Sequence, residues 1–155
     1  SIQPLLLFGF KNEAKVLILS AGVGYPAIPT AVFRPDLHIT MVEENQEART
    51  MLRRCIEVSG LQNLVVAECG ASEIVGEFDY VVQRDAENLQ SFTRVAKHLV
   101  KPEGRLYTYR TEAFEEELGE ITMNKDEEGV CVSEIAEYDL ANQVFGLNLV
   151  AFELF

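Results

Sequence analysis

Short apolar runs alternate with amphipathic stretches along the chain, a pattern typical of an α/β domain. Continuous apolar runs predict five buried parallel strands: Lys15–Leu19, His38–Val42, Leu64–Ala67, Phe78–Val82 and Arg105–Tyr109. Apolar residues at helical spacing predict helices at Pro29–Phe33, Gln46–Val58 and Leu89–Leu99, with a charged helix at Glu112–Leu118. Asn45 and Gly60 are expected to begin and end the second helix, and Lys101–Gly104 to form a turn.

The end of the chain follows a different pattern. Val130–Tyr138 and Leu147–Phe155 are both strand-like, and Asp139–Gly146 between them is too short for a typical crossover helix. We therefore expect an antiparallel hairpin added to the parallel sheet. The predicted fold class is α/β and Rossmann-like, with a mostly parallel seven-stranded sheet and helices on both faces. Residues 1–14 are expected to form a short N-terminal arm, and residues 15–155 one domain.

The segment Val16–Pro29 carries the clearest functional pattern. An apolar run ends at Ser20 and is followed by a tight loop with Gly22 and Gly24, and Glu43 comes nineteen residues after Gly24, at the end of the next apolar run. Glycines let a backbone approach a ligand closely, and a carboxylate can accept hydrogen bonds from both hydroxyls of a ribose. Strand, glycine turn, helix, strand and acid together indicate a site for an adenosine-containing cofactor. Glu44 is the less favoured alternative for the acid.

Further short motifs narrow the class of protein to which the chain can be compared. They are Gly22-x-Gly24-Tyr25-Pro26-x-Ile28-Pro29, Arg34-Pro35-Asp36, Leu61-Gln62-Asn63-Leu64, Phe78-Asp79-Tyr80-Val81 with Arg84, and Gly104-Arg105-Leu106-Tyr107. Over residues 16–155 the chain resembles the glucose-inhibited division protein B family, the small-subunit ribosomal RNA guanine-N7 methyltransferases. The resemblance implies the fold of class I methyltransferases that use S-adenosyl-L-methionine (SAM).

The same resemblance implies roles for individual residues. The residues expected to bind SAM are Gly22, Gly24, Glu43, Ala71, Ser72 and Glu73. Tyr25, Pro26 and Arg110 are expected to face the substrate. Arg84 is expected to orient the target base or to contact the carboxylate of the cofactor; the alternative is an ion pair with Asp85 or Glu87. For Tyr107, base stacking is the less favoured alternative to a place in the core.

Composition limits the partners. Thirteen Lys and Arg against 25 Asp and Glu give a net charge of −12, which argues against a large footprint on nucleic acid and weakens the expectation of a ribosomal RNA partner. Three cysteines without a paired spacing and two histidines indicate reduced thiols in the cytoplasm and no metal site. No apolar run is long enough for a membrane helix. No pattern specifies an oligomeric state.

Two alternatives remain beside a SAM-dependent methyltransferase. Ile18, Ser20 and Ala27 stand where the resembled family has Asp, Gly and Gly, and these departures motivate a degenerate fold that serves as a non-catalytic binding or structural module. Gly22–Ala27 also fits the dinucleotide pattern G-x-G-x-x-[GA] formally. Pro26 stands where the helix of a nicotinamide-binding domain should begin, so that reading is disfavoured.

Overall fold

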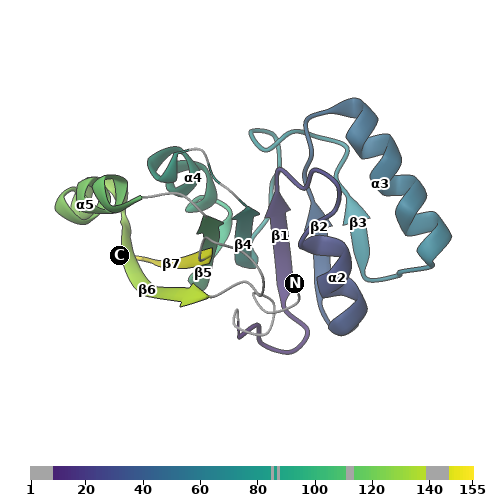
Figure 1. Cartoon of the computed structure of the whole chain (residues 1–155), viewed down its shortest axis with the longest axis horizontal. Helices are drawn as coiled ribbons and strands as arrows, with labels where there is room; N and C mark the ends of the chain where they lie inside the picture. The colour runs from purple at the N-terminus through teal and green to yellow at the C-terminus, as the bar shows by residue number, and fades with distance from the viewer. Residues whose placement is uncertain (1–8, 85, 87, 111–113, 139–146) are drawn as a thin grey trace.

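The computed structural model describes residues 9–84, 86, 88–110, 114–138 and 147–155. These residues form a seven-stranded sheet of order β3-β2-β1-β4-β5-β7-β6 with helices on both faces (Figure 1). The strands are β1 (Lys15–Leu19), β2 (His38–Met41), β3 (Leu64–Val66), β4 (Phe78–Arg84), β5 (Val100–Arg110), β6 (Val130–Tyr138) and β7 (Leu147–Leu154). The helices are α2 (Ala27–Phe33), α3 (Gln46–Ser59), α4 (Leu89–Ala96), α5 (Glu115–Met123) and α6 (Lys125–Glu128).

The pairing of the strands confirms the predicted fold class. β1 lies between β2 and β4, and these pairings, like those of β2 with β3 and β4 with β5, are parallel. β7 inserts between β5 and β6 and is antiparallel to both. The predicted hairpin is therefore present, while its connection, Asp139–Gly146, lies outside the described residues.

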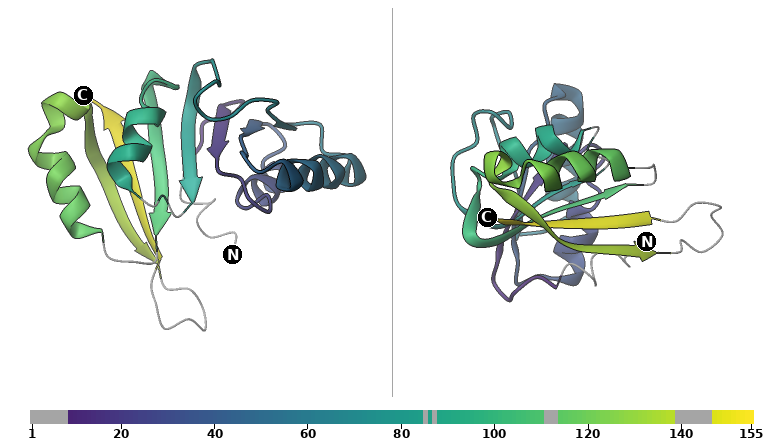
Figure 2. Two further views of the ribbon diagram at one scale, coloured as in Figure 1. Left: turned by 90° about the horizontal axis from the view of Figure 1, so that it is seen from above. Right: turned by 90° about the vertical axis from the view of Figure 1, so that its left-hand side faces the viewer.

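Two apolar layers hold the helices to the sheet. On one face, Ala27 and Ala31 of α2 and Leu52 of α3 pack in a buried cluster with Ile18 and Ile39 of the sheet. On the other face, α4 and α5 bury Leu89, Phe92, Ala96, Leu118 and Ile121 against the sheet. The views in Figure 2 show α4 and α5 beside the β5–β7–β6 half and α3 at the opposite end of the molecule. Parallel strands buried on both faces explain why these segments are continuously apolar.

The ends of α3 follow local sequence rules. The Asn45 side chain accepts a hydrogen bond from the Ala48 backbone N–H at 3.0 Å, and Gly60 ends the helix with a left-handed φ of 70°. The predicted cap and stop are therefore both confirmed.

Other boundaries differ from the predictions. α2 begins at Ala27 instead of Pro29, and α4 ends at Ala96 instead of Leu99. The predicted turn at Lys101–Gly104 is wrong, because these residues belong to β5, and an irregular register opposite Phe78 and Tyr80 accommodates the glycine and proline. The charged helix is α5, which begins later than predicted; Glu112 lies outside the described residues.

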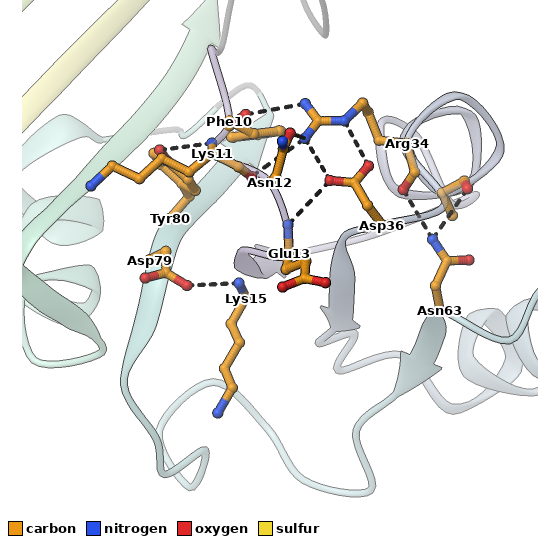
Figure 3. A network of polar contacts seen from close by, with 11 residues as sticks. Phe10, Lys11, Asn12, Glu13, Lys15, Arg34, Asp36, Asn63, Asp79 and Tyr80 are labelled. Atoms are coloured by element: carbon orange, nitrogen blue, oxygen red, sulfur yellow. Dashed lines mark hydrogen bonds and ion pairs between the residues drawn. The ribbon is translucent and has the colours of Figure 1, made fainter.

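The N-terminal edge of the sheet is fixed by a polar network (Figure 3). The Arg34 guanidinium donates to Asp36 at 2.7 and 2.8 Å and to the Phe10 carbonyl at 3.1 Å. The Asn63 amide donates to the carbonyls of Ala31 and Arg34, both at 3.2 Å. Arg34, Asp36 and Asn63, which carried part of the family resemblance, therefore act in the scaffold at the edge where the parallel strands begin.

The last part of the predicted N-terminal arm joins the core. Phe10 and Ala14 are buried in the same cluster as Tyr80 and Tyr107. The Phe10 and Tyr80 rings lie 4.8 Å apart, and the Tyr80 and Tyr107 rings stack at 6.0 Å. Tyr107 thus lies in the core.

Candidate functional site

The loop after β1 and the end of β2 meet at the edge where the parallel strands end. Ala21 N–H donates to the Val42 carbonyl at 3.0 Å, and Val42 N–H donates to the Ile18 carbonyl at 2.9 Å. This pairing places Gly22 beside Glu43, which are 21 residues apart in the chain. Ligands of open α/β sheets bind at this edge.

Both oxygens of the Glu43 carboxylate are positioned by the backbone. Oε2 accepts from the Gly22 N–H at 2.7 Å, and Oε1 accepts from the Asn45 N–H at 2.9 Å. A carboxylate oxygen has two acceptor sites, so each oxygen keeps one for a ligand hydroxyl. Glu43 is half-buried, whereas Glu44 is exposed and its carboxylate lies beside Gly70. The geometry therefore favours Glu43 over Glu44.

Arg49 of α3 supports this strand end. Its guanidinium donates to the Glu43 carbonyl at 2.8 Å and to the Glu44 carbonyl at 3.2 Å. The neighbouring Arg53 instead forms an exposed ion pair with Glu68 at 2.6 Å. The two arginines are four residues apart and share a face of α3, but no pattern in the sequence identifies Arg49 as the residue that holds Glu43.

The two glycines of the loop have different surroundings. Gly22 has a φ of +54°, and a Cβ there would meet only the Ser20 carbonyl oxygen, at 4.0 Å. Gly24 has a φ of +89°, and a Cβ there would collide with the side chains of Ile28 and Leu52. Gly22 therefore leaves space at the ligand edge, whereas Gly24 lets the loop pack against the helices.

A cavity of about 460 Å³ opens between the ends of β1 and β4 and the start of α4. It is lined by Leu19, Ser20, Ala71, Gln83, Arg84, Asn88, Ser91, Phe92 and Val95. The apolar side chains come from the end of β1, the loop after β3 and α4. The polar side chains come from the ends of β1 and β4 and from the beginning of α4.

Tyr25 and Arg84 meet at this edge on the opposite face of the sheet from α4. The Arg84 guanidinium carbon lies 5.4 Å from the centroid of the Tyr25 ring, and the Tyr109 ring meets Tyr25 edge-on at 6.4 Å. Burial raises the pKa of the Tyr25 hydroxyl, and the positive charge of Arg84 partly opposes that rise. Arg84 itself is exposed at the end of β4.

The amino-acid sequence matches the model of a known family. Residues 1–143 match the family model described as rRNA small subunit methyltransferase G, or GidB. The chain belongs to the GidB family.

Relatives of known name agree with this assignment. The ribosomal RNA small subunit methyltransferase G of Lactobacillus helveticus is 32% identical in an alignment of 129 positions that covers 77% of this chain and 53% of that protein. The protein of the same name from Stenotrophomonas maltophilia (strain K279a) is 30% identical in an alignment of 122 positions that covers 77% of this chain and 58% of the relative. The chain thus spans a little over half the length of these relatives.

Solved structures agree on the fold. Ribosomal protein L11 methylase from Lactobacillus delbrueckii superposes with a TM-score of 0.76 at 14% identity, over 99% of this chain and 76% of that one. M. jannaschii TYW2, solved in complex with AdoMet, superposes with a TM-score of 0.75 at 16% identity, over 99% and 74% of the two chains. At these identities the likeness establishes a methyltransferase fold.

The three residues after β3 that the GidB resemblance assigns to SAM binding do not lie together. Of Ala71, Ser72 and Glu73, only Ala71 lines the cavity between β1 and β4. Ser72 is exposed along a separate surface groove, and Glu73 accepts a hydrogen bond from the Gly70 N–H at 3.2 Å.

The residues expected to face the substrate also divide between locations. Pro26 is buried, and its carbonyl accepts hydrogen bonds from the backbone N–H and the hydroxyl of Thr30. Arg110 is largely buried in an ion pair with Glu117 at 2.8 Å, on the α5 side of the sheet. Tyr25 therefore lies with Arg84, while Arg110 lies on the other face. Asp85 and Glu87, the alternative partners of Arg84, lie outside the described residues.

The described part of the chain contains neither a membrane-spanning helix nor a cluster of metal-ligating side chains. No helix there is long and apolar enough to cross a membrane. Among the same residues, no group of three or more His, Cys, Asp or Glu side chains is arranged to hold a metal ion.

Proposed function

We propose that this chain is the core of a SAM-dependent methyltransferase that acts on guanine N7 of small-subunit ribosomal RNA. The observation that carries the proposal is the Glu43 carboxylate, which two backbone N–H groups hold at the strand end with acceptor sites left over. The names of the GidB-family relatives supply the substrate class. The free thiols Cys55, Cys69 and Cys131 support a cytoplasmic location.

The residues at the sheet edge suit the parts of SAM. Glu43 would accept hydrogen bonds from the ribose hydroxyls, and Gly22 leaves room for a close approach of the ligand to the loop. Ala71 and Phe92 give the cavity between β1 and β4 an apolar wall that suits an adenine ring. When bound, SAM supplies a methyl group that its sulfonium has already activated for transfer.

The protein needs few reactive groups for this chemistry. Guanine N7 has a free lone pair and carries no proton, so the transfer needs no general base, only alignment of the base and exclusion of water. Arg84 can donate a hydrogen bond to O6 of guanine, and Tyr25 beside it can stack on the ring. These two side chains would orient the base.

Two observations favour a second candidate, a non-catalytic binding or structural module. Arg110, the second arginine expected to face the substrate, is buried against Glu117, and the net charge of −12 disfavours contact with RNA phosphates.

The decisive measurement is calorimetric titration of S-adenosylhomocysteine into the wild-type chain and into Glu43→Ala. We expect binding to the wild type and at least a tenfold loss in Glu43→Ala, because hydrogen bonds to a charged acceptor are lost. Glu44→Ala is the matched control and should bind like the wild type. Absence of binding by folded wild-type protein would contradict the proposal and favour the module. Methylation of small-subunit ribosomal RNA lacking the N7 mark then tests the substrate.

A further inference from the structure

The surface groove beside Ser72 adjoins the cavity between β1 and β4. It has a volume of about 520 Å³ and shares two lining residues with that cavity, Ala71 after β3 and Val95 of α4. This α4 groove is therefore an extension of the cavity that the cofactor is proposed to fill. Its other apolar residues come from the loop before β4 and from the turn after α4: Ile74, Val75 and Leu99.

Two valines present apolar surface in the α4 groove. Val75 is 91% exposed, the largest fraction among the large hydrophobic side chains that the structure describes, and Val95 is 42% exposed. Val75 belongs to the loop before β4 and Val95 to α4, so both walls of the groove carry apolar surface. An apolar group of a ligand would release the water that lies on this surface, which favours binding.

The charged side chains of the α4 groove do not favour an anion. The Arg94 guanidinium donates to the Glu128 carboxylate at 2.7 and 3.2 Å, so a carboxylate of the protein already balances its charge. Glu77 adds a negative charge to the lining. A neutral, apolar group therefore suits the groove better than a phosphate or a carboxylate.

Backbone hydrogen bonds fix both walls of the groove. In the loop before β4, the N–H groups of Glu73 and Ile74 donate to the Gly70 carbonyl at 3.1 and 3.2 Å. After α4, the Leu99 carbonyl accepts from the Phe78 N–H at 2.9 Å, which ties the end of the helix to the start of β4. A groove with fixed walls binds a ligand without first having to be ordered.

We propose that the α4 groove is a subsite for an apolar group carried on N6, the exocyclic amino group of the cofactor's adenine. In the proposed function, the ribose lies at Glu43 and the adenine lies against Ala71. The amino group is on the six-membered ring of adenine, whereas the ribose is attached to the five-membered ring. A group on N6 therefore extends away from Glu43 and past Ala71 into the groove. The inference rests on the proposed function, because it requires the adenine to lie in the cavity between β1 and β4.

The test compares S-adenosylhomocysteine with N6-benzyl-S-adenosylhomocysteine by calorimetry. We expect the wild type to bind the benzyl ligand at least as tightly as the parent, because the benzyl ring replaces water on Val75 and Val95. Val75→Asp should weaken binding of the benzyl ligand about fivefold, because the ring would remove water from a charged group. The affinity of this variant for the parent should not change, since Val75 lines the groove but not the cavity between β1 and β4.

Val58→Asp is the matched control. Val58 is a valine of α3 that is 81% exposed, so this variant adds the same charge outside the groove and should keep both wild-type affinities. A wild type that binds the benzyl ligand more weakly than the parent would overturn the inference and leave the proposed function standing. An unchanged affinity of Val75→Asp for the benzyl ligand, or an equal loss in Val58→Asp, would do the same. Failure of the folded wild type to bind either ligand would overturn the proposed function and the inference together.

Discussion

The Glu43 carboxylate is held in place by backbone N–H groups and by one arginine that surround it. Gly22 and Asn45 donate their backbone N–H groups to it, and Arg49 holds the backbone on which it sits. These hydrogen bonds fix the orientation of the carboxylate, so a ligand does not have to order it. At the residue scale, the site is organised before any ligand arrives.

Replacing Arg49 tests that organisation. Arg49→Met removes the hydrogen bonds to the Glu43 and Glu44 carbonyls and keeps a side chain of similar length. We expect the affinity for S-adenosylhomocysteine to fall about two- to tenfold, the range for one or two net hydrogen bonds. Arg53→Met breaks only the exposed pair with Glu68 and should leave the affinity unchanged. Equal losses in both variants would indicate a general electrostatic effect in place of positioning by Arg49.

The loop glycines should differ in their tolerance of a methyl group. Gly24→Ala adds both a strained left-handed conformation and a collision with Ile28 and Leu52, and should cost about 2–4 kcal/mol of unfolding free energy. Gly22→Ala meets no crowding and should cost only about 1–2 kcal/mol. Urea denaturation measures both values. A larger loss in Gly22→Ala would refute the separation of a packing glycine from a glycine at the ligand edge.

At the scale of elements, Glu117 of α5 joins three parts of the fold. One of its oxygens accepts from Arg110 at the end of β5 at 2.8 Å, and the other accepts from the Leu89 N–H in the first turn of α4 at 2.7 Å. The carboxylate thus neutralises a largely buried cation and satisfies an N–H that the helix itself leaves unpaired. The sequence analysis expected Arg110 to face the substrate and did not predict its ion pair with Glu117, because spacing alone does not show which charged side chains fold back on the sheet.

Substitutions at Glu117 should separate these two functions. Glu117→Ala leaves Arg110 unpaired and should lower the unfolding free energy by about 3 kcal/mol. Glu117→Gln keeps an acceptor for the Leu89 N–H and should lower it by about 1 kcal/mol. Glu116→Ala, on the exposed side of α5, should change it by less than about 0.5 kcal/mol. Urea denaturation of the three variants gives the comparison, and equal effects at Glu116 and Glu117 would exclude the bridging role.

At the scale of the whole molecule, the sequence predicted the sheet, the antiparallel tail and the glycine–acid frame, because these depend on apolar periodicity and on contacts between neighbouring elements. It failed where distant segments meet. The turn expected at Lys101–Gly104 lies inside β5 as an irregular stretch between Val100 and Arg105, the residues that pair with Phe78 and Tyr80 of β4. Arg49 gave no local signal, because its role comes from the fold of the loop between β2 and α3.

Polar side chains lie at two opposite edges of the sheet and serve different purposes there. The edge where the parallel strands end carries Glu43 and Arg84, the residues proposed to bind ligands, whereas Arg34, Asp36 and Asn63 hold the edge where the strands begin (Figure 3). A substitution at Asp36 should therefore change the unfolding free energy at low pH without changing ligand binding at the edge that carries Glu43. The dependence of the unfolding free energy on pH tests this separation.

The Arg34 guanidinium, by hydrogen bonding, holds the pKa of the Asp36 carboxyl well below its usual range. A carboxyl with a lower pKa in the folded state stabilises the fold fully above the unfolded-state pKa of about 3.9 and loses this contribution as the pH falls through the folded-state value. The unfolding free energy of the wild type should therefore exceed that of Asp36→Asn by a constant amount above about pH 5, and the difference should shrink steadily below about pH 4. Urea denaturation of both proteins at several pH values measures it, and binding of S-adenosylhomocysteine at pH 7 should be the same in both. A difference that stays constant down to pH 2.5 would show that the ion pair between Arg34 and Asp36 does not govern acid stability.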